Sequence, residues 1–199
     1  MSRLSGRALA IAALAALLVA CGGPGATSTP SASARPPAKS GKSVSAVGRS
    51  TPVRLRIPAI GVDTPVMKLG LAADGSVQVP PIAAHDRAGW YEHSPTPGRT
   101  GPSVILGHVT VGAYGDGVFR RLGELHRGEK IVTRLENGTA AVFAVTEVRT
   151  VSKAHFPSDE VYGNVNRPEL RLITCGGKRT GDGYLDNVIV FAALSSAGP

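Results

Sequence analysis

From Thr51 to the end of the chain, apolar residues occur in short runs that alternate with polar residues or are rich in β-branched side chains. Runs of this length and composition are typical of β-strands rather than of amphipathic helices. We therefore expect strands in seven stretches, residues 52–62, 75–81, 101–110, 129–135, 140–151, 170–175 and 187–194.

Glycine-containing turn signals separate these runs, at residues 74–75, 115–117, 137–138 and 176–183. Asn137–Gly138 is the strongest of them, because Asn–Gly between two strand-like runs favours a tight hairpin. One stretch, 119–125, has the apolar spacing of a short helix. Seven or eight short strands with one small helix predict an all-β domain over residues 51–199, closed into a barrel so that few strand edges are exposed.

The first twenty residues have a different character. Arg3 and Arg7 precede an apolar run of 13 residues, Ala8–Ala20, which has the length of a signal-peptide core and is short for a membrane span. The segment ends in LVAC, which resembles a bacterial lipobox with Cys21 as the diacylated residue. We predict a lipoprotein-type signal peptide over residues 1–20 and a lipid anchor that holds the domain at the extracytoplasmic face of the membrane. An ordinary cleaved signal peptide and a marginal membrane anchor are the alternatives.

Residues 21–50 consist mainly of Gly, Pro, Ala, Ser and Thr, with a few basic residues and no aromatic side chain. Such a segment buries too little apolar surface to order itself, so we expect a disordered tether after the lipidated cysteine. The net charge of +8 arises mostly in residues 1–50, which hold six of the 22 basic residues and none of the 14 acidic ones. The domain is therefore nearly neutral, and the sequence does not favour nucleic acid as a partner.

Cys175 ends the apolar run 170–175 and is followed by two glycines. Exported domains usually pair their cysteines, but with Cys21 assigned to lipid, Cys175 has no partner in the chain. It is then either a small buried apolar residue or a nucleophile, and a nucleophile requires a nearby imidazole. Among the five histidines, His108 stands out because it also follows an apolar run, and the ends of two core strands can meet on one rim of a barrel. By itself, His108 is more often a hydrogen-bonded structural residue than a catalyst.

The sequence lacks the motifs that metal binding, serine hydrolysis and nucleotide binding require. A zinc site needs three or four ligands, usually with a close pair, and His85 and His93, the nearest pair, lie eight residues apart, so we expect no metal. The sequence has neither a G-x-S-x-G motif nor a phosphate-binding glycine loop, which argues against serine hydrolysis and nucleotide binding. Phe156 and Tyr162 are expected to cover one end of the barrel.

The run LRLITC, residues 170–175, resembles the TLxTC signature of sortases, the cysteine transpeptidases of Gram-positive cell surfaces. Residues 101–110 resemble the strand that carries the sortase histidine, and the wider pattern over about Val53–Ala193 is similar to the actinobacterial class F branch. The resemblance implies an eight-stranded sortase-type barrel with one or two short helices. It also implies Cys175 as the nucleophile, His108 as its partner, and no metal or organic cofactor.

By this resemblance, the thiolate of Cys175 attacks the threonine carbonyl of an LPxTG-like sorting peptide of a surface protein and forms a thioester. A peptidoglycan amine, or the amine of a precursor, then takes the acyl group. His108 holds the thiolate as an ion pair or protonates the leaving amine. We expect these two substrates, and the membrane through the lipid anchor, as the partners of a monomeric protein.

The chain departs from the sortase pattern at one position, because sortases place an arginine just before the last strand, where this chain has Leu185–Asp186. Arg179, in the glycine-rich loop after the cysteine, is our candidate for stabilising the oxyanion. Arg171 shares the strand face of Cys175 at a Cα separation of about 13 Å, which suits substrate binding or an ion pair of the barrel. Backbone N–H groups at residues 176–177 are a further source of oxyanion stabilisation.

The departure leaves two other functions open. A non-catalytic surface lipoprotein could use a sortase-like barrel as a binding module, with Cys175 as a buried spectator. A hydrolase could use the same cysteine and histidine and pass the acyl group to water. The reactivity of the thiol separates the first alternative from an enzyme, and the products formed with and without an added amine separate the second from a transpeptidase.

Overall fold

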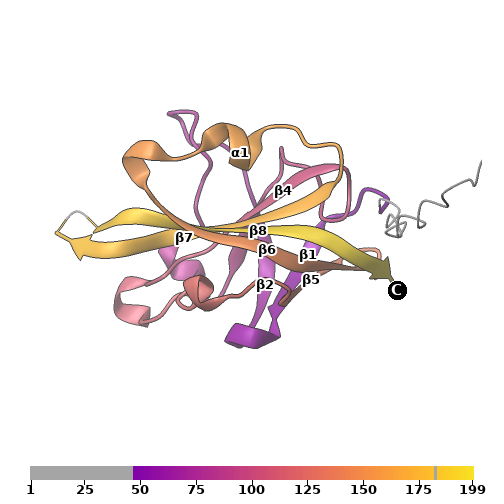
Figure 1. The fold of residues 1–199 in the computed structure, drawn as a ribbon. Helices are drawn as coiled ribbons and strands as arrows, with labels where there is room; N and C mark the ends of the chain where they lie inside the picture. The colour runs from indigo at the N-terminus through magenta and orange to yellow at the C-terminus, as the bar shows by residue number, and fades with distance from the viewer. Residues whose placement is uncertain (1–46, 182) are drawn as a thin grey trace, which may run out of the picture. The chain divides into compact units, whose positions relative to one another are not determined.

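The computed structural model describes residues 47–181 and 183–199. In this part of the chain, eight strands form a closed barrel in the order β1-β2-β3-β4-β7-β8-β6-β5 (Figure 1). The strands are β1 (Pro52–Ile57), β2 (Val62–Leu69), β3 (Ala88–Tyr91), β4 (Gly101–Leu106), β5 (Lys130–Leu135), β6 (Ala140–Ser152), β7 (Pro168–Thr180) and β8 (Gly183–Gly198). The predicted closed, eight-stranded, all-β barrel is confirmed.

Six of the seven predicted strands form, and the Asn137–Gly138 hairpin joins β5 to β6 as expected. The seventh, 75–81, is wrong: it lies in an irregular loop with a single bridge between Leu71 and Val77. Two strands were not predicted. β2 follows a reversal in which Gly61 has a φ of 71°, and β3 is only four residues long. Its short span carries too little periodicity to be recognised.

The described helices are short. They comprise one α-helix, α1 (Ser158–Tyr162), and five single 3-10 turns, η1 (Pro58–Ile60), η2 (Ile82–Ala84), η3 (Gly112–Tyr114), η4 (Leu122–Glu124) and η5 (Lys153–His155). The helix predicted over 119–125 is wrong, because this segment forms turns and η4. Phe119, Leu122 and Leu125 are nevertheless buried, so their spacing reflects burial against the barrel and not helix formation.

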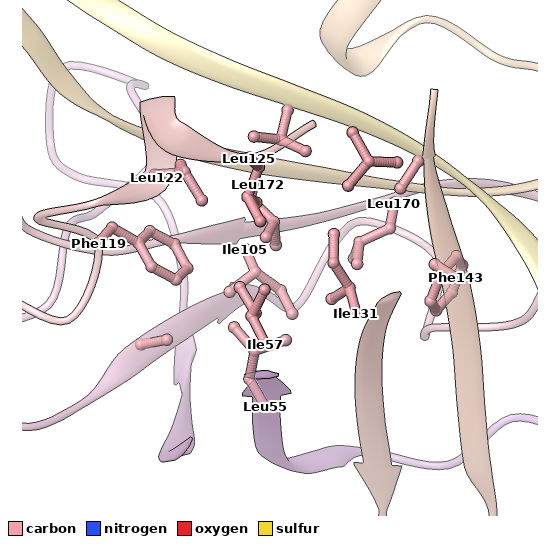
Figure 2. Close-up of a cluster of buried hydrophobic side chains, with 14 of the residues drawn as sticks. Leu55, Ile57, Ile105, Phe119, Leu122, Leu125, Ile131, Phe143, Leu170 and Leu172 are labelled. Carbon is pink, nitrogen blue, oxygen red and sulfur yellow. The ribbon is translucent and has the colours of Figure 1, made fainter. Parts of the chain in front are cut away.

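The main hydrophobic core fills the inside of the barrel (Figure 2). Leu55, Ile105, Phe143 and Leu172 reach it from four different strands, and Phe119 closes it from the loop after β4. Each of these side chains is fully buried, and burial of one such side chain stabilises the fold by roughly 1.5–3 kcal/mol relative to exposure.

A second, smaller cluster covers the outer face of the sheet. It contains Val104, Ile173, Ile189 and Phe191 from the strands and Val161 from α1. Side chains alternate along a strand, so the interior residues of β7, Leu170 and Leu172, leave Arg171, Ile173 and Cys175 on this outer face. The expectation that Phe156 and Tyr162 cover a barrel end is wrong. Phe156 packs against the outer cluster, and the ring of Tyr162 lies 6.1 Å from that of Phe156.

Strands β7 and β8 extend past the barrel as a hairpin arm, which projects beyond the other strands in Figure 1. β6 pairs with β8 only as far as Asp186, whereas β7 pairs with β8 to the Thr180–Gly183 pair. The glycine-rich stretch 176–183, predicted as a loop, is therefore mostly strand. This arm carries the segment that follows Cys175.

The predicted signal peptide (1–20), Cys21 and most of the predicted tether lie outside the described residues. The described chain begins at Val47, whose N–H donates a hydrogen bond to the carbonyl of Gly98 at 2.8 Å. Ser50 accepts a hydrogen bond from the N–H of Asn137 at 3.1 Å, so residues 47–50 lie against the barrel. From residue 47 onward, the described part of the chain has no helix long and apolar enough to cross a membrane.

Candidate active site

Strands β4 and β7 run parallel and place His108 and Cys175 at the same end of the sheet. Their pairing ends with Leu106 opposite Ile173, and the N–H of Gly107 continues it with a hydrogen bond to the carbonyl of Ile173 at 3.1 Å. His108 and Cys175 each lie two residues beyond the Leu106–Ile173 pair. Because neighbouring strands lie only about 4.8 Å apart, this register sets His108 and Cys175 at corresponding positions just beyond the paired part of two adjacent strands.

Cys175 is half-buried and is the one free cysteine among the described residues. A cavity of about 200 Å³ touches Cys175, but its lining by Phe119, Tyr184 and Val188 places it on the inward face of the strands, opposite the outer face to which the thiol points. The thiol is therefore neither sealed in the barrel core nor fully exposed. This position suits a nucleophile that must meet a substrate and still be shielded from bulk water.

His108 is half-buried, and a main-chain group holds its ring. Its Nε2 lies 2.6 Å from the carbonyl oxygen of Pro80. Since a carbonyl can only accept, Nε2 carries the hydrogen and Nδ1 is left to exchange a proton. Among the described residues, the hydrogen-bond partner of the ring is thus Pro80 and not the Cys175 thiol, and apo sites often tighten such contacts only when substrate binds.

The loop that carries Pro80 is anchored to neighbouring elements. Thr64 of β2 donates its hydroxyl to the carbonyl of Asp86 at 2.5 Å. The ring of His85 stacks on that of Tyr114 with a centroid separation of 4.3 Å, which joins this loop to the one after His108. These contacts hold the loop whose Pro80 carbonyl meets the imidazole, from outside β4 and β7.

The other four histidines are exposed, and two of them pack against tyrosine rings. His85 stacks on Tyr114, and His93 meets the ring of Tyr91 edge-on in the β3–β4 loop. His126 and His155 are exposed, in the turn before β5 and in η5. In residues 47–181 and 183–199, no three His, Cys, Asp or Glu side chains gather closely enough to hold a metal ion.

Arg171 is buried in an ion pair, with only 4% of its side chain exposed. Its Nη2 lies 2.5 Å from Oε2 of Glu169, its guanidinium lies over the ring of Phe191 at 4.6 Å, and Nε donates to the carbonyl of Glu160. Of the two roles predicted for Arg171, this arrangement favours the barrel ion pair over substrate binding.

Burial raises the pKa of Glu169, but hydrogen bonds from Arg171 and Arg167 and the charges of both arginines outweigh it and leave the pKa below its ordinary value of 4.5. A lowered pKa means that the carboxylate stabilises the folded chain above about pH 4.5 and that this stabilisation is lost as the pH falls through the folded-state pKa.

We expect Glu169→Gln to lower the free energy of unfolding by about 3 kcal/mol at pH 7, because it leaves the buried guanidinium without a counter-charge. The deficit relative to wild type should shrink as the pH falls from about 4.5 through the lowered folded-state pKa of Glu169, because the wild-type carboxylate is then protonated as well. Urea unfolding at several pH values measures this. A deficit that stays constant with pH would contradict the ion-pair assignment.

Arg179 lies on the opposite face of the hairpin arm from Cys175. Cys175 pairs with Asn187, but a register shift after Gly176 makes Arg179 the partner of Tyr184. Paired residues share a face, and on β8 residue 184 faces away from residue 187, so Arg179 does not share the face of the thiol. Leu185, where sortases have arginine, does face the same way as Asn187 and is half-exposed.

Comparison with known proteins identifies the family. The sortase domain model matches residues 55–195. The chain belongs to the sortase family. The SrtA sortase from Actinomyces oris is 27% identical, with a TM-score of 0.56 over 76% of this chain and 82% of that one. Sortase A of Listeria monocytogenes is 18% identical and shares the fold, with a TM-score of 0.56 over 75% of this chain and 90% of that one.

A Clostridium perfringens sortase D5 transpeptidase is 23% identical, with a TM-score of 0.53 over 74% of this chain and 81% of that one, and it also shares the fold. None of the curated proteins compared with the chain matches it. Family membership makes the protein a sortase transpeptidase, of a family that acts outside the cytoplasm on sorting signals of surface proteins and on cell-wall amines. The class F subtype stays a prediction.

Sequence reasoning missed three parts of this site. The contact of the Pro80 carbonyl with His108 leaves no signal in the sequence, because every residue has a main-chain carbonyl. Arg120 follows Phe119, in the segment wrongly predicted to be helical, and lines the cavity beside Cys175 with its Nε 3.1 Å from Asp116. Asn187 was included only as the first residue of a predicted strand, and its pairing with Cys175 depends on the register of the arm.

Proposed function

We propose that this sortase cleaves an LPxTG-like sorting peptide through a thioester on Cys175 and transfers the acyl group to a cell-wall amine. The observation that supports the proposal is the parallel register of β4 and β7, by which half-buried Cys175 and half-buried His108 each follow the last paired residues of two adjacent strands. The order of the two residues and the surrounding sortase domain support it.

The proposed first step forms the bond between Sγ of Cys175 and the threonine carbonyl carbon, and the carbonyl electron pair moves to oxygen. The tetrahedral intermediate then collapses, the C–N bond breaks, and the amine leaves with a proton from His108. In the second step the acceptor amine attacks the thioester, loses a proton to His108 and expels the thiolate. The enzyme returns to its starting state without a metal, an oxidant or a reductant.

The direct test incubates the full-length protein, in mild detergent, with an LPxTG peptide and analyses it by intact-protein mass spectrometry. We expect an acyl adduct on Cys175 that disappears when a glycine or diamine acceptor is added, together with the corresponding amide product. An adduct that yields only the free acid in the presence of the acceptor would indicate a hydrolase.

A binding module is the second candidate, favoured by Leu185 at the position of the sortase arginine. It predicts a thiol that resists alkylation by iodoacetamide at neutral pH until the domain unfolds. Absence of an adduct over a broad panel of peptides, together with a resistant thiol, would replace the transpeptidase by the binding module.

We also propose that Cys21 carries the lipid that anchors the enzyme at the extracytoplasmic face of the membrane, with the domain beginning near residue 51. The support is the lipobox-like end of the apolar segment and the basic residues that precede it. In cells fed a radioactive or alkyne-tagged fatty acid, the wild type should be labelled and Cys21→Ala should not. A Cys21→Ala protein labelled as strongly as the wild type would contradict the assignment.

A further inference from the structure

The register of the hairpin arm places Asn187 directly opposite Cys175. The two residues are paired in the antiparallel β7–β8 ladder, so their side chains leave the sheet on the same face. Directly opposed residues have Cβ atoms about 4.5–5.5 Å apart, and an asparagine side chain brings its amide still closer to the position of Sγ. Asn187 is half-buried, as Cys175 is.

The other neighbours of Asn187 on this face are apolar. Val151 of β6 is its partner on the far side, and Leu185 and Ile189 precede and follow it on the same face of β8. In the part of the chain that the structure describes, no hydrogen bond engages its side-chain amide. A half-buried amide among aliphatic side chains is stabilised only when it gains a hydrogen-bond partner, and the space in front of Cys175 is where a substrate carbonyl would supply one.

The arginines predicted to stabilise the oxyanion (Arg179) and to bind substrate (Arg171) lie elsewhere. Arg171 forms an ion pair with Glu169, and its guanidinium lies over the ring of Phe191. Arg179 lies on the opposite face of the arm from Cys175. Leu185 lies on the same face as Cys175, but its side chain has no hydrogen-bond donor. Asn187 is thus the one side chain with N–H donors that the register of β7 and β8 presents beside the thiol.

We propose that the side-chain amide of Asn187 donates a hydrogen bond to the oxyanion formed when Cys175 attacks an acyl group, in place of the arginine that sortases use. This inference rests on the proposed role of Cys175 as nucleophile. When the S–C bond forms, the carbonyl electron pair moves to oxygen, and Nδ2–H of Asn187 stabilises that negative charge until the leaving group departs. A neutral amide can do this because its dipole is already oriented by the strand.

The proposal is tested by comparing two reactions of the same thiol in the full-length protein. Acylation by p-nitrophenyl acetate passes through a tetrahedral oxyanion and releases p-nitrophenolate, whereas alkylation by iodoacetamide displaces iodide and forms no oxyanion. We expect Asn187→Ala to slow acylation by about 10²-fold or more, the usual loss for one oxyanion donor, and to leave alkylation nearly unchanged.

Two further variants sharpen the comparison. Val151→Ala loosens the packing on the other side of Asn187 without removing a donor, so it should change both rates by the same small factor. Leu185→Arg in the Asn187→Ala background should recover much of the lost acylation rate, because it restores a cation on the same strand face. Alkylation rates and thermal unfolding show directly whether each variant is folded.

Equal losses in acylation and alkylation would overturn the proposal, because Asn187 would then act on the thiolate or on the fold. An unchanged acylation rate would also overturn it and would assign the oxyanion to the backbone N–H groups at residues 176–177. Ester acylation that depends on Asn187, with no adduct from any sorting peptide, would support the role of Asn187 and contradict the proposed substrate. If the wild-type thiol were alkylated by iodoacetamide but not acylated by the ester, the result would contradict the proposed role of Asn187 in stabilising the oxyanion.

Discussion

Cys175→Ala is expected to abolish both the acyl adduct and the transfer product, with a loss in rate of at least about 10⁴-fold. The loss should be this large because Cys175 is the one cysteine among the described residues, so no other described side chain can supply a sulfur nucleophile. Rates are measured from the amide product, by liquid chromatography of the reaction with peptide and amine.

Cys175→Ser is the matched control, because it keeps the size of the side chain and replaces the thiol by a hydroxyl that is a far weaker nucleophile at neutral pH. It should be nearly as inactive as the alanine variant. Both variants should melt close to the wild type, since a half-buried side chain at the edge of a cavity adds little to the core. Turnover by Cys175→Ala above a few per cent of the wild-type rate would show that another residue is the nucleophile.

His108→Ala is expected to slow acylation by the peptide by about 10²–10⁴-fold, the usual contribution of a positioned general acid or base. The imidazole contributes by favouring the thiolate and by protonating the leaving amine, so both thioester formation and its aminolysis should slow. Imidazole added to the buffer should restore part of the rate, because a small molecule can occupy the space left by the side chain.

His126→Ala is the control for this prediction, because His126 is exposed in the turn before β5 and does not follow a strand that pairs with β7. It should leave the rate unchanged. If His108→Ala retained the wild-type rate, the imidazole would be a structural residue held by Pro80, and the general acid would have to be another group.

The positions of Cys175 and His108 at strand ends could be predicted because their signals are local. Cys175 and His108 each follow a short apolar run, and such runs form core strands whatever the order of strands in the sheet. That the ends of these two strands are adjacent depends on β4 and β7 being parallel neighbours, which was not predicted and which the strand pairing shows. The two strands that were missed, β2 and β3, are recognisable mainly from their pairing.

The surroundings of the pair could not be predicted in the same way. Arg171 could have faced a substrate, and only the packing of Glu169 and Phe191 around it shows that its charge is used inside the fold. The Pro80 carbonyl reaches His108 across 28 residues of sequence, through a loop anchored at Thr64 and Tyr114. Contacts of this kind depend on the tertiary fold and leave no periodicity in the sequence.

The sequence by itself determined the closed barrel, the hairpin at Asn137–Gly138 and the two strand ends that carry chemistry, because alternation and turn glycines act between near neighbours. Only the tertiary structure decided which residue faces Cys175 across the arm. Without the register shift after Gly176, the turn that pairs Thr180 with Gly183 would set Cys175 against Val188. One extra residue in β7, at a glycine with a φ of 70°, exchanges the faces of the arm, turning Asn187 toward the thiol and Arg179 away from it.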